Sequence, residues 1–254
     1  MPNTAFRYFF ILTTIEINVT ICQRNKKGIF DMTIAAQWLN STFASFDFSI
    51  LEFYHMIATY ASPILTPICQ FFAFIGDGAL ACFLLAAILL LFPKTRKAGL
   101  CVLFAVGLGA LITNVAVKNI VARPRPYASE VAQFAKWWNY IGAPLESEFS
   151  FPSGHTTAAM AGVTGLCLGY DKNRKWWIFL LSALYVIIMG ASRNYLMVHY
   201  PSDIIGGIIS GAIGGALAYL LIYMLYKILD GKKDKKASAF ILNADIRSIF
   251  TTKI

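Results

Sequence analysis

The chain has 254 residues, of which 57% are hydrophobic, 15% aromatic and only 14% charged, and its mean hydropathy is +0.61. Soluble domains carry about a quarter charged residues, so this composition excludes an ordinary soluble domain and indicates an integral membrane protein with several spans. The formal net charge of +9 does not indicate a nucleic-acid partner, because the basic residues lie mainly in short links between apolar blocks.

The first 53 residues precede the apolar blocks. Residues 1–31 form an uncertain N-terminal extension, whose apolar patch is interrupted by Arg7 and Glu16 and lacks the clean core of a secretory signal. Translation could therefore start at Met1 or at Met32. Residues 32–53 carry aromatic anchors and predict an amphipathic segment in the membrane interface. His55 follows without a partner motif and is interpreted as structural.

Six apolar blocks then predict an all-α fold, a polytopic membrane helical bundle with six transmembrane helices. The expected spans cover residues 54–75, 79–92, 98–117, 153–170, 176–191 and 204–226. Pro63 and Pro67 should bend the first span, and the second must borrow flanking residues because a span needs about 20. The six spans make one domain, 54–226, followed by a basic cytoplasmic tail, 227–254.

The links at 93–97 and 171–175 and the C-terminal tail are rich in Lys and Arg, which places them in the cytoplasm. Six spans would put both termini on that side and the stretches 118–151 and 191–203 outside. The outer stretches nevertheless hold several cations: Lys118, Arg123, Arg125, Lys136 and Arg193. Such a violation of the charge bias indicates that these cations do something other than set topology.

The five cysteines show no CxxC or other paired spacing, and four of them lie inside apolar blocks. We expect free, packed thiols and no disulfide framework. They are Cys22, Cys69, Cys82, Cys101 and Cys167.

A charged cluster lies between the fifth and sixth blocks and contains Arg193, His199 and Asp203. Charges at the mouth of a membrane helix are costly, which favours a functional role. Pro201 suits the first turn of a helix, so Asp203 would lie in that turn and could accept a hydrogen bond from one ring nitrogen of His199. The other nitrogen would then be free as a nucleophile. Taken alone, a helix-capping Asp beside an interfacial His explains the pattern equally well.

Two further motifs are expected on the same face, KNIVARPRP with Lys118 and Arg125, and PSGH at 152–155. Ser153 is a suitable N-cap and Gly154 lets a ligand approach the backbone at a helix N-terminus, which binds anions. With Arg193, these cations describe a phosphate cradle. Each motif alone could be structural, as a snorkelling Lys, a helix cap or an extended linker. Their joint occurrence on one face favours a site.

The three motifs resemble the signature of the type-2 phosphatidic acid phosphatase family. This family includes lipid phosphate phosphatases, bacterial phosphatidylglycerophosphate and undecaprenyl-diphosphate phosphatases, glucose-6-phosphatase and vanadium haloperoxidases. The resemblance covers residues 54–226, and no signature position departs from the pattern. It implies a helical bundle, with six membrane helices in the lipid-active members, in the cell membrane and with the active site at the extracytoplasmic face.

The resemblance also implies the role of each matched residue. His199 would attack phosphorus and form a phosphohistidine, Asp203 would orient it, and His155 would act as general acid and then as base. The phosphate oxygens would be held by Lys118, Arg125, Ser153, Gly154 and Arg193. Arg123 lies between the matched positions and is interpreted as a headgroup contact.

The implied activity is removal of the terminal phosphate of a lipid phosphate or diphosphate, such as undecaprenyl diphosphate, phosphatidylglycerophosphate or phosphatidate. Three cations can supply what Mg²⁺ supplies elsewhere, so we expect no metal and no other cofactor. A vanadate-dependent haloperoxidase is an alternative that six apolar blocks disfavour. A non-catalytic lipid-binding or transport protein is another, disfavoured by the intact His155, His199 and Asp203. The sequence does not specify the lipid or the oligomeric state.

Overall fold

The computed structural model describes residues 32–170 and 176–231, and every regular element in these ranges is helical. The all-helical prediction is confirmed for this part of the chain, whereas the predictions for 1–31 and for most of the tail lie outside it. The elements are α2 (Ile34–Thr42), α3 (Ala44–Gly76), the 3₁₀ turn η1 (Asp77–Ala79), α4 (Leu80–Leu90), α5 (Arg96–Ala110), the π-helical η2 (Leu111–Val117), α6 (Lys118–Val121), the 3₁₀ turn η3 (Pro126–Ala128), α7 (Ala132–Tyr140), α8 (Gly154–Gly169), α9 (Trp176–Tyr195) and α10 (Pro201–Asp230).

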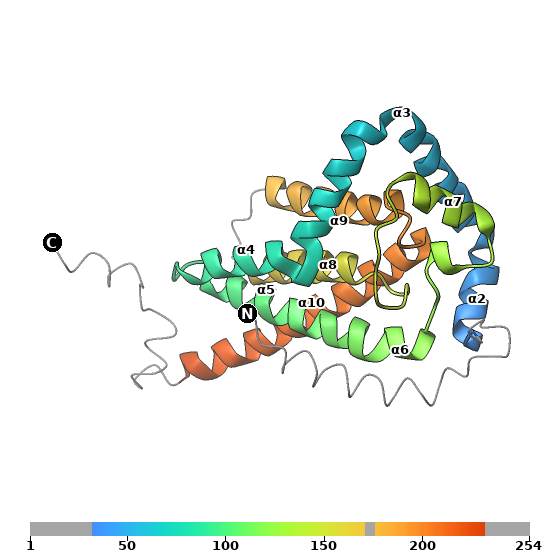
Figure 1. The fold of residues 1–254 in the computed structure, drawn as a ribbon. Coiled ribbons are helices and arrows are strands. Elements are labelled where there is room, and N and C mark those ends of the chain that lie inside the picture. Colours follow the sequence, from blue (N-terminus) through green and yellow to red (C-terminus); the bar gives the residue numbers. More distant parts are fainter. Residues whose placement is uncertain (1–31, 171–175, 232–254) are drawn as a thin grey trace, which may run out of the picture.

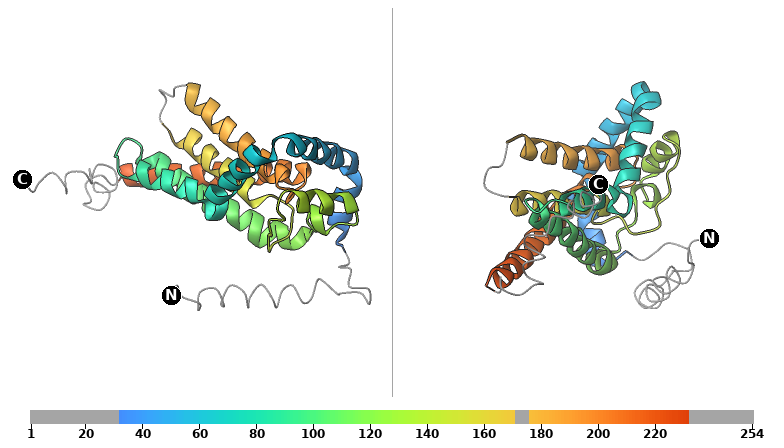
Figure 2. Two further views of the ribbon diagram at one scale, coloured as in Figure 1. Left: turned by 45° about the horizontal axis from the view of Figure 1, so that its top comes forward. Right: turned by 90° about the vertical axis from the view of Figure 1, so that its left-hand side faces the viewer.

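Helix α8 forms the centre of the bundle and packs against α5, α9 and α10 (Figure 1). Both views in Figure 2 keep α8 between α9 and the α5–α10 pair. Because α8 contacts all three neighbours, its first turn, which carries the PSGH motif, is fixed relative to the ends of α9 and α10.

Small residues allow this close packing. A Cβ atom added at Gly211 of α10 would lie 2.5 Å from the Thr157 carbonyl oxygen of α8, and one at Gly214 would lie 2.8 Å from the Gly109 nitrogen of α5. Small residues at helix interfaces let backbones approach where lipid offers no hydrophobic driving force. The glycines of α10 therefore bring the site-bearing helices into contact.

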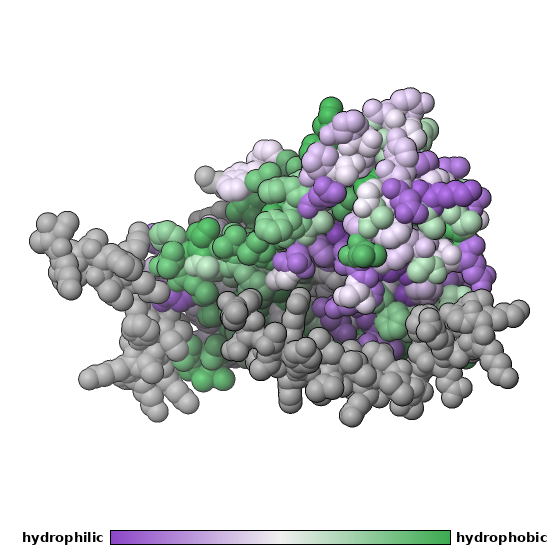
Figure 3. Space-filling model, in the orientation of Figure 1, coloured by the Kyte–Doolittle hydropathy of each residue, from purple (hydrophilic) through white to green (hydrophobic). Residues whose placement is uncertain are grey.

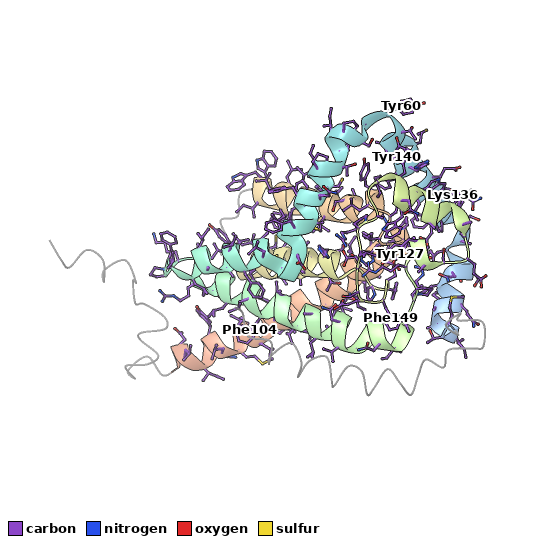
Figure 4. The ribbon with its side chains drawn as sticks, viewed as in Figure 1. Tyr60, Phe104, Tyr127, Lys136, Tyr140 and Phe149 are labelled. Carbon is purple, nitrogen blue, oxygen red and sulfur yellow. The ribbon has the colours of Figure 1, made fainter. Side chains whose placement is uncertain are left out.

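Helix α3 differs from the predicted first span. It begins at Ala44, inside the segment expected to lie in the membrane interface, and it bends near Tyr60, where Figure 4 marks the top of the arch. Two internal prolines follow the bend, and each removes a backbone hydrogen bond. The Ser202 amide at the start of α10 donates to Asp47 (2.8 Å), while the Ala73 carbonyl lies 3.1 Å from His155 at the start of α8. Both ends of α3 thus lie at one end of the bundle.

The predicted count of six spans is not confirmed. Four helical segments are long and apolar enough to cross a membrane: Ala44–Leu90, Arg96–Ala128, Trp176–Tyr195 and Pro201–Asp230. Helix α8 has 16 residues, fewer than the roughly 20 that a bilayer requires. Helix α9 runs beyond its predicted end at 191, which places Arg193 in its last turn.

The two ends of the bundle differ in polarity. Figure 3 shows hydrophobic residues over α4, α5 and α10 and hydrophilic residues gathered around α7 and α2. The polar end holds the starts of α8 and α10, whereas the α4–α5 link lies at the opposite end with the last turns of α10 (Figure 1). Cys69, Cys82, Cys101 and Cys167 are free thiols, as predicted, and Cys22 lies outside the described residues.

Candidate active site

The structure brings the predicted site residues together at the polar end. Lys118 begins α6, Arg125 precedes η3, Arg193 lies in the last turn of α9, and His199 directly precedes α10. These four side chains are buried, although three of them carry a formal charge. Burying several cations together is costly unless anions accompany them. The arrangement therefore requires counter-charges.

The ring of His199 is held between Arg125 and Asp203. Arg125 Nη1 lies 3.1 Å from His199 Nε2, and because arginine can only donate, Nε2 must accept through its lone pair. The proton of the neutral ring then lies on Nδ1, which is 3.4 Å from Asp203 Oδ2. This is ion-pair range, but Nδ1 makes no hydrogen bond, so the predicted bond to Asp203 is not formed in this geometry.

Burial lowers the pKa of His199 well below its ordinary value, and the charges of Arg125, Arg193 and Lys118 and the nearby His155 lower it further. The imidazole is therefore neutral over the physiological pH range. A neutral ring with an unprotonated Nε2 has the lone pair that nucleophilic attack requires.

The start of α8 has the predicted cap. Ser153 is the N-cap, and its hydroxyl accepts from the Thr156 hydroxyl at 3.0 Å and, at 3.5 Å, from the Thr156 amide. A Cβ at Gly154 would lie 3.5 Å from Lys118 Nζ, so the ammonium group faces the N-terminus of α8. Free backbone amides and a lysine at one point form an anion site.

His155, in the first turn of α8, packs against the end of α3. Its Nε2 lies 3.1 Å from the Ala73 carbonyl oxygen, which can only accept, so Nε2 carries a proton. A Cβ at Gly76 would lie 2.7 Å from the ring, so a side chain at that position would displace His155. The sequence did not predict this contact between α3 and the motif histidine.

Two glutamates that the sequence analysis did not single out supply the counter-charges. Glu146 pairs with Arg193 and lies 3.8 Å from Arg125, and Glu148 pairs with Lys118. Burial alone would raise the pKa of Glu146, but Arg193 and Arg125 outweigh burial and hold it below its ordinary value. All three predicted cradle cations are thus paired with carboxylates from the loop before α8.

Arg123 is not the predicted headgroup contact. Its side chain is only 1% exposed and lies behind Asp203, away from the cradle. It donates to Asp203 (2.7 Å), Asp47 (2.8 Å) and Asn40 (2.8 Å), and its guanidinium carbon lies 3.8 Å from the centre of the Tyr200 ring. These buried hydrogen-bond partners explain why this arginine turns inward while Arg125, two residues later, faces the cradle.

A cavity of about 900 Å³ lies on the other side of the Asp47–Arg123 pair, between α2, the start of α3 and the chain that leads to α7. Among the predicted site residues and Arg123, only Arg123 contributes to its walls. The cavity is therefore distinct from the cradle, where the loop glutamates occupy the space between the cations. Within residues 32–170 and 176–231, no three His, Cys, Asp or Glu side chains converge as metal ligands.

Comparison with known proteins identifies the family of this chain. The model of the PAP2 superfamily matches residues 98–227, which is 130 of the 254 residues and includes every predicted site residue. The chain belongs to the PAP2 superfamily. Its helical bundle is accordingly a PAP2 fold.

Two PAP2 relatives are named for polyprenyl substrates. The chain is 30% identical over 121 residues to the undecaprenyl-diphosphatase of Sulfolobus acidocaldarius, covering 48% of this chain and 53% of the relative. It is 34% identical over 118 residues to the decaprenylphosphoryl-5-phosphoribose phosphatase of Mycolicibacterium smegmatis, covering 45% and 55%. The chain thus spans about half the length of these relatives.

A solved structure shows the same fold. The transmembrane PAP2-type phosphatidylglycerolphosphate phosphatase of Bacillus subtilis matches with a TM-score of 0.55 and 23% identity, over 80% of this chain and 93% of that chain. This likeness covers a larger share of the chain than the family match does.

Proposed function

We propose that this protein is an integral membrane phosphatase that removes the terminal phosphate of a lipid phosphate or diphosphate through a phosphohistidine on His199. The observation that carries the proposal is a buried His199 whose Nε2 lies 3.1 Å from Arg125 Nη1, in a cluster of three cations. The names of the relatives, an undecaprenyl-diphosphatase and a decaprenylphosphoryl-5-phosphoribose phosphatase, support a lipid substrate.

The reaction has two displacements at phosphorus. His199 Nε2 attacks, an N–P bond forms, and the P–O bond to the lipid breaks. His155, once protonated on Nδ1 beside the bound phosphate, gives that proton to the leaving oxygen. Water then attacks the phosphohistidine, His155 takes its proton, and inorganic phosphate leaves as the N–P bond breaks. While the N–P bond exists, the His199 ring carries a positive charge unless it loses its Nδ1 proton. The Asp203 carboxylate, 3.4 Å from Nδ1, can stabilise that positive charge.

Three cations would stabilise the charge on the transferred group, and this supports a reaction that needs no metal. Lys118 and the N-terminus of α8 face one another across the cradle, and Arg193 Nε is buried without a hydrogen-bond partner among the described residues. A phosphate would satisfy that donor and displace Glu146 and Glu148. Ser153 and Gly154 would complete the cradle from the start of α8.

We further propose that the site lies at the extracytoplasmic face. The basic link at 93–97 lies at the opposite end and marks that end as cytoplasmic under the positive-inside rule. In a variant that lacks the native cysteines, a single cysteine between 128 and 148 should be labelled in intact cells by an impermeant reagent. Labelling of Lys172→Cys instead would reverse the orientation.

Phosphate release from a panel of lipid phosphates, in detergent and in vesicles, tests the activity. We expect turnover in EDTA and inhibition by vanadate, which mimics the five-coordinate transition state.

Lipid phosphates should exceed soluble phosphate esters in kcat/KM at matched surface concentration, because each buried CH₂ group of the lipid chain contributes about 0.8 kcal/mol. No release from any lipid, or activity only with added Mg²⁺, would overturn the proposal. Halide oxidation in the presence of vanadate would identify a haloperoxidase instead.

A further inference from the structure

Behind the cradle lies a second charged cluster, in which only Asp203 has a role in the proposed phosphatase chemistry. Asp47 in the first turn of α3 and Asp203 in the first turn of α10 both pair with Arg123, and the three side chains are 2%, 0% and 1% exposed. Asp47 lies outside the part of the chain that matches the family model, residues 98–227. Nothing in the motifs assigns a role to it or to Arg123.

The geometry points to a positioning function: an Asp47–Arg123–Asp203 chain of ion pairs fixes the Asp203 carboxylate and its charge opposite His199. Arg123 and Asp47 touch neither the cradle nor the space for phosphate, so they are positioning residues. The kinetic part of this inference rests on the proposed function, whereas the part that concerns the charge of His199 does not.

Each end of the chain of ion pairs is tied to a helix terminus. Asp47 accepts from the Ser202 amide at 2.8 Å and from the Ser202 hydroxyl at 2.7 Å, both in the first turn of α10. Arg123 Nη1 bridges the same Ser202 hydroxyl and Asp203 Oδ1, each at 2.7 Å. The start of α3 therefore holds the start of α10 through two charge-assisted hydrogen bonds, and Arg123, between α6 and η3, adds two more.

The second oxygen of Asp203 is fixed independently. Asp203 Oδ2 accepts from the Tyr200 amide at 2.9 Å and from the Ser150 hydroxyl, and it is this oxygen that faces His199 Nδ1. With both oxygens bound, the carboxylate cannot rotate away from the histidine. The Tyr200 ring lies against the guanidinium of Arg123 and closes the cluster on that side.

The same ion pairs also determine how strongly the negative charge of Asp203 favours the protonated form of His199. Three cations face its ring on the cradle side, Arg125, Arg193 and Lys118, together with His155, whose pKa is lowered to about 4 by burial and by Arg193. One anion, Asp203, faces it on the other side. Arg123 offsets the charge of Asp203, and Asp47 offsets that of Arg123. Removing Arg123 should therefore favour the protonated ring, whereas removing the charge of Asp47 should disfavour it.

The two variants should shift the pKa of His199 in opposite directions. This can be tested by NMR of the whole protein, with isotope-labelled histidine in detergent micelles. The chain has only three histidines, so its imidazole signals can be assigned by single substitutions. Arg123→Met should raise the measured pKa of His199 by about one unit or more, the scale on which a nearby charge acts. Asp47→Asn should lower it or leave the ring neutral throughout the range. General loosening would instead admit water and raise the pKa in both variants.

Kinetics give the second arm, on a lipid phosphate. Asp47→Asn and Arg123→Lys should lower kcat by roughly 10–100-fold through misplacement of Asp203, with KM unchanged, because neither residue touches substrate. Arg123→Lys keeps the charge, so its histidine titration should stay near that of the unmodified protein. A matched control is Arg96→Met, which removes a buried arginine at the start of α5, far from the cradle. It should change neither the pKa of His199 nor kcat.

Two results would overturn the inference: unchanged His199 titration and kcat in Arg123→Met, or shifts of the same sign in Arg123→Met and Asp47→Asn. If the unmodified protein released phosphate from no lipid, the proposed function would fail, and the NMR arm would still decide whether the ion pairs act on His199.

Discussion

Arg123 and Arg125 are two residues apart, yet they belong to two clusters with opposite properties. Arg123 pairs with carboxylates from α3 and α10 that are 3% and 0% exposed. Arg125 shares the cradle with Glu146 and Glu148, which come from a loop and are 28% and 55% exposed. One cluster has counter-ions built into helices, and the other has counter-ions on a segment that water reaches.

This difference separates a fixed ion pair from an exchangeable one. Breaking a buried pair leaves an uncompensated charge and is strongly destabilising, so the Arg123 cluster is suited to hold a geometry. The ion pair of a partly exposed glutamate contributes little free energy, so little is lost when another anion replaces the glutamate. The cradle is therefore suited to a ligand that arrives and leaves, which is the behaviour expected of a phosphate site.

The largest expected effect is at His199. His199→Ala removes the attacking atom and should lower kcat by at least about 10⁴-fold, the scale seen when a catalytic nucleophile is deleted. The measurement is phosphate release from a lipid phosphate, with His55→Gln as a matched control because His55 stacks on Trp137 away from the cradle. Near-normal kcat in His199→Ala would show that another group attacks.

Next in size is the loss of one cradle cation. Lys118→Met should lower kcat by about 10²–10³-fold, as loss of one donor to a developing oxyanion does elsewhere. The same substitution should also weaken inhibition by vanadate, because the ammonium faces the anion site at the start of α8. Unchanged vanadate inhibition would place the phosphate away from Lys118.

A smaller effect of opposite sign is expected when the exchangeable counter-ions are neutralised. Glu146→Gln and Glu148→Gln should each tighten vanadate inhibition about two- to fivefold, since each removes a competitor whose ion pair contributes at most about 1 kcal/mol. Asp47→Asn, the matched change in the fixed cluster, should not tighten it. An equal change in vanadate inhibition in all three variants would contradict the distinction between exchangeable and fixed ion pairs.

The smallest effect concerns pH and stability. The pKa of His199 in the folded protein lies below that of the unfolded chain, about 6.5, so below that pH the unfolded state binds a proton that the folded state does not. Stability should thus fall as pH falls below about 6.5, by at most about 1.4 kcal/mol per pH unit from this group. His199→Gln should flatten the dependence of the melting temperature on pH from 7 to 5. An unaltered slope would show that His199 is protonated in the folded state.

Motif spacing together with the family resemblance predicted the residues of the cradle. Lys118, Arg125, PSGH and the His199–Asp203 pair lie next to helix termini whose positions follow from caps and prolines. The loop glutamates carried a weak signal, two acidic residues separated by one in an outer stretch that is otherwise cationic. Alternate residues of an extended segment point to the same side, which could have placed both towards the cations.

The fixed cluster could not be predicted in this way. Asp47 is 155 residues from Ser202, its hydrogen-bond partner, and no local pattern links an acidic residue in an apolar helix to a distant helix start. The sequence predicted a bend in α3 from Pro63 and Pro67, but it missed for the same reason that the bend returns the helix to the polar end. Its hydropathy fits a span, and only its contacts at Asp47 and Ala73 show that both ends lie at the polar end of the bundle.

The most direct test of the central claim is the covalent intermediate. His155→Ala should be mixed with a lipid diphosphate carrying ³²P in its terminal phosphate, because a lipid phosphate leaves without help from a general acid while hydrolysis still lacks its base. Rapid quenching in alkali should then yield labelled protein whose label is stable to base and labile to acid and maps to the peptide that contains His199. The His155→Ala/His199→Ala double variant should yield none. Label on another residue, or release of ³²P-phosphate by His155→Ala with no labelled protein at any time, would contradict the account.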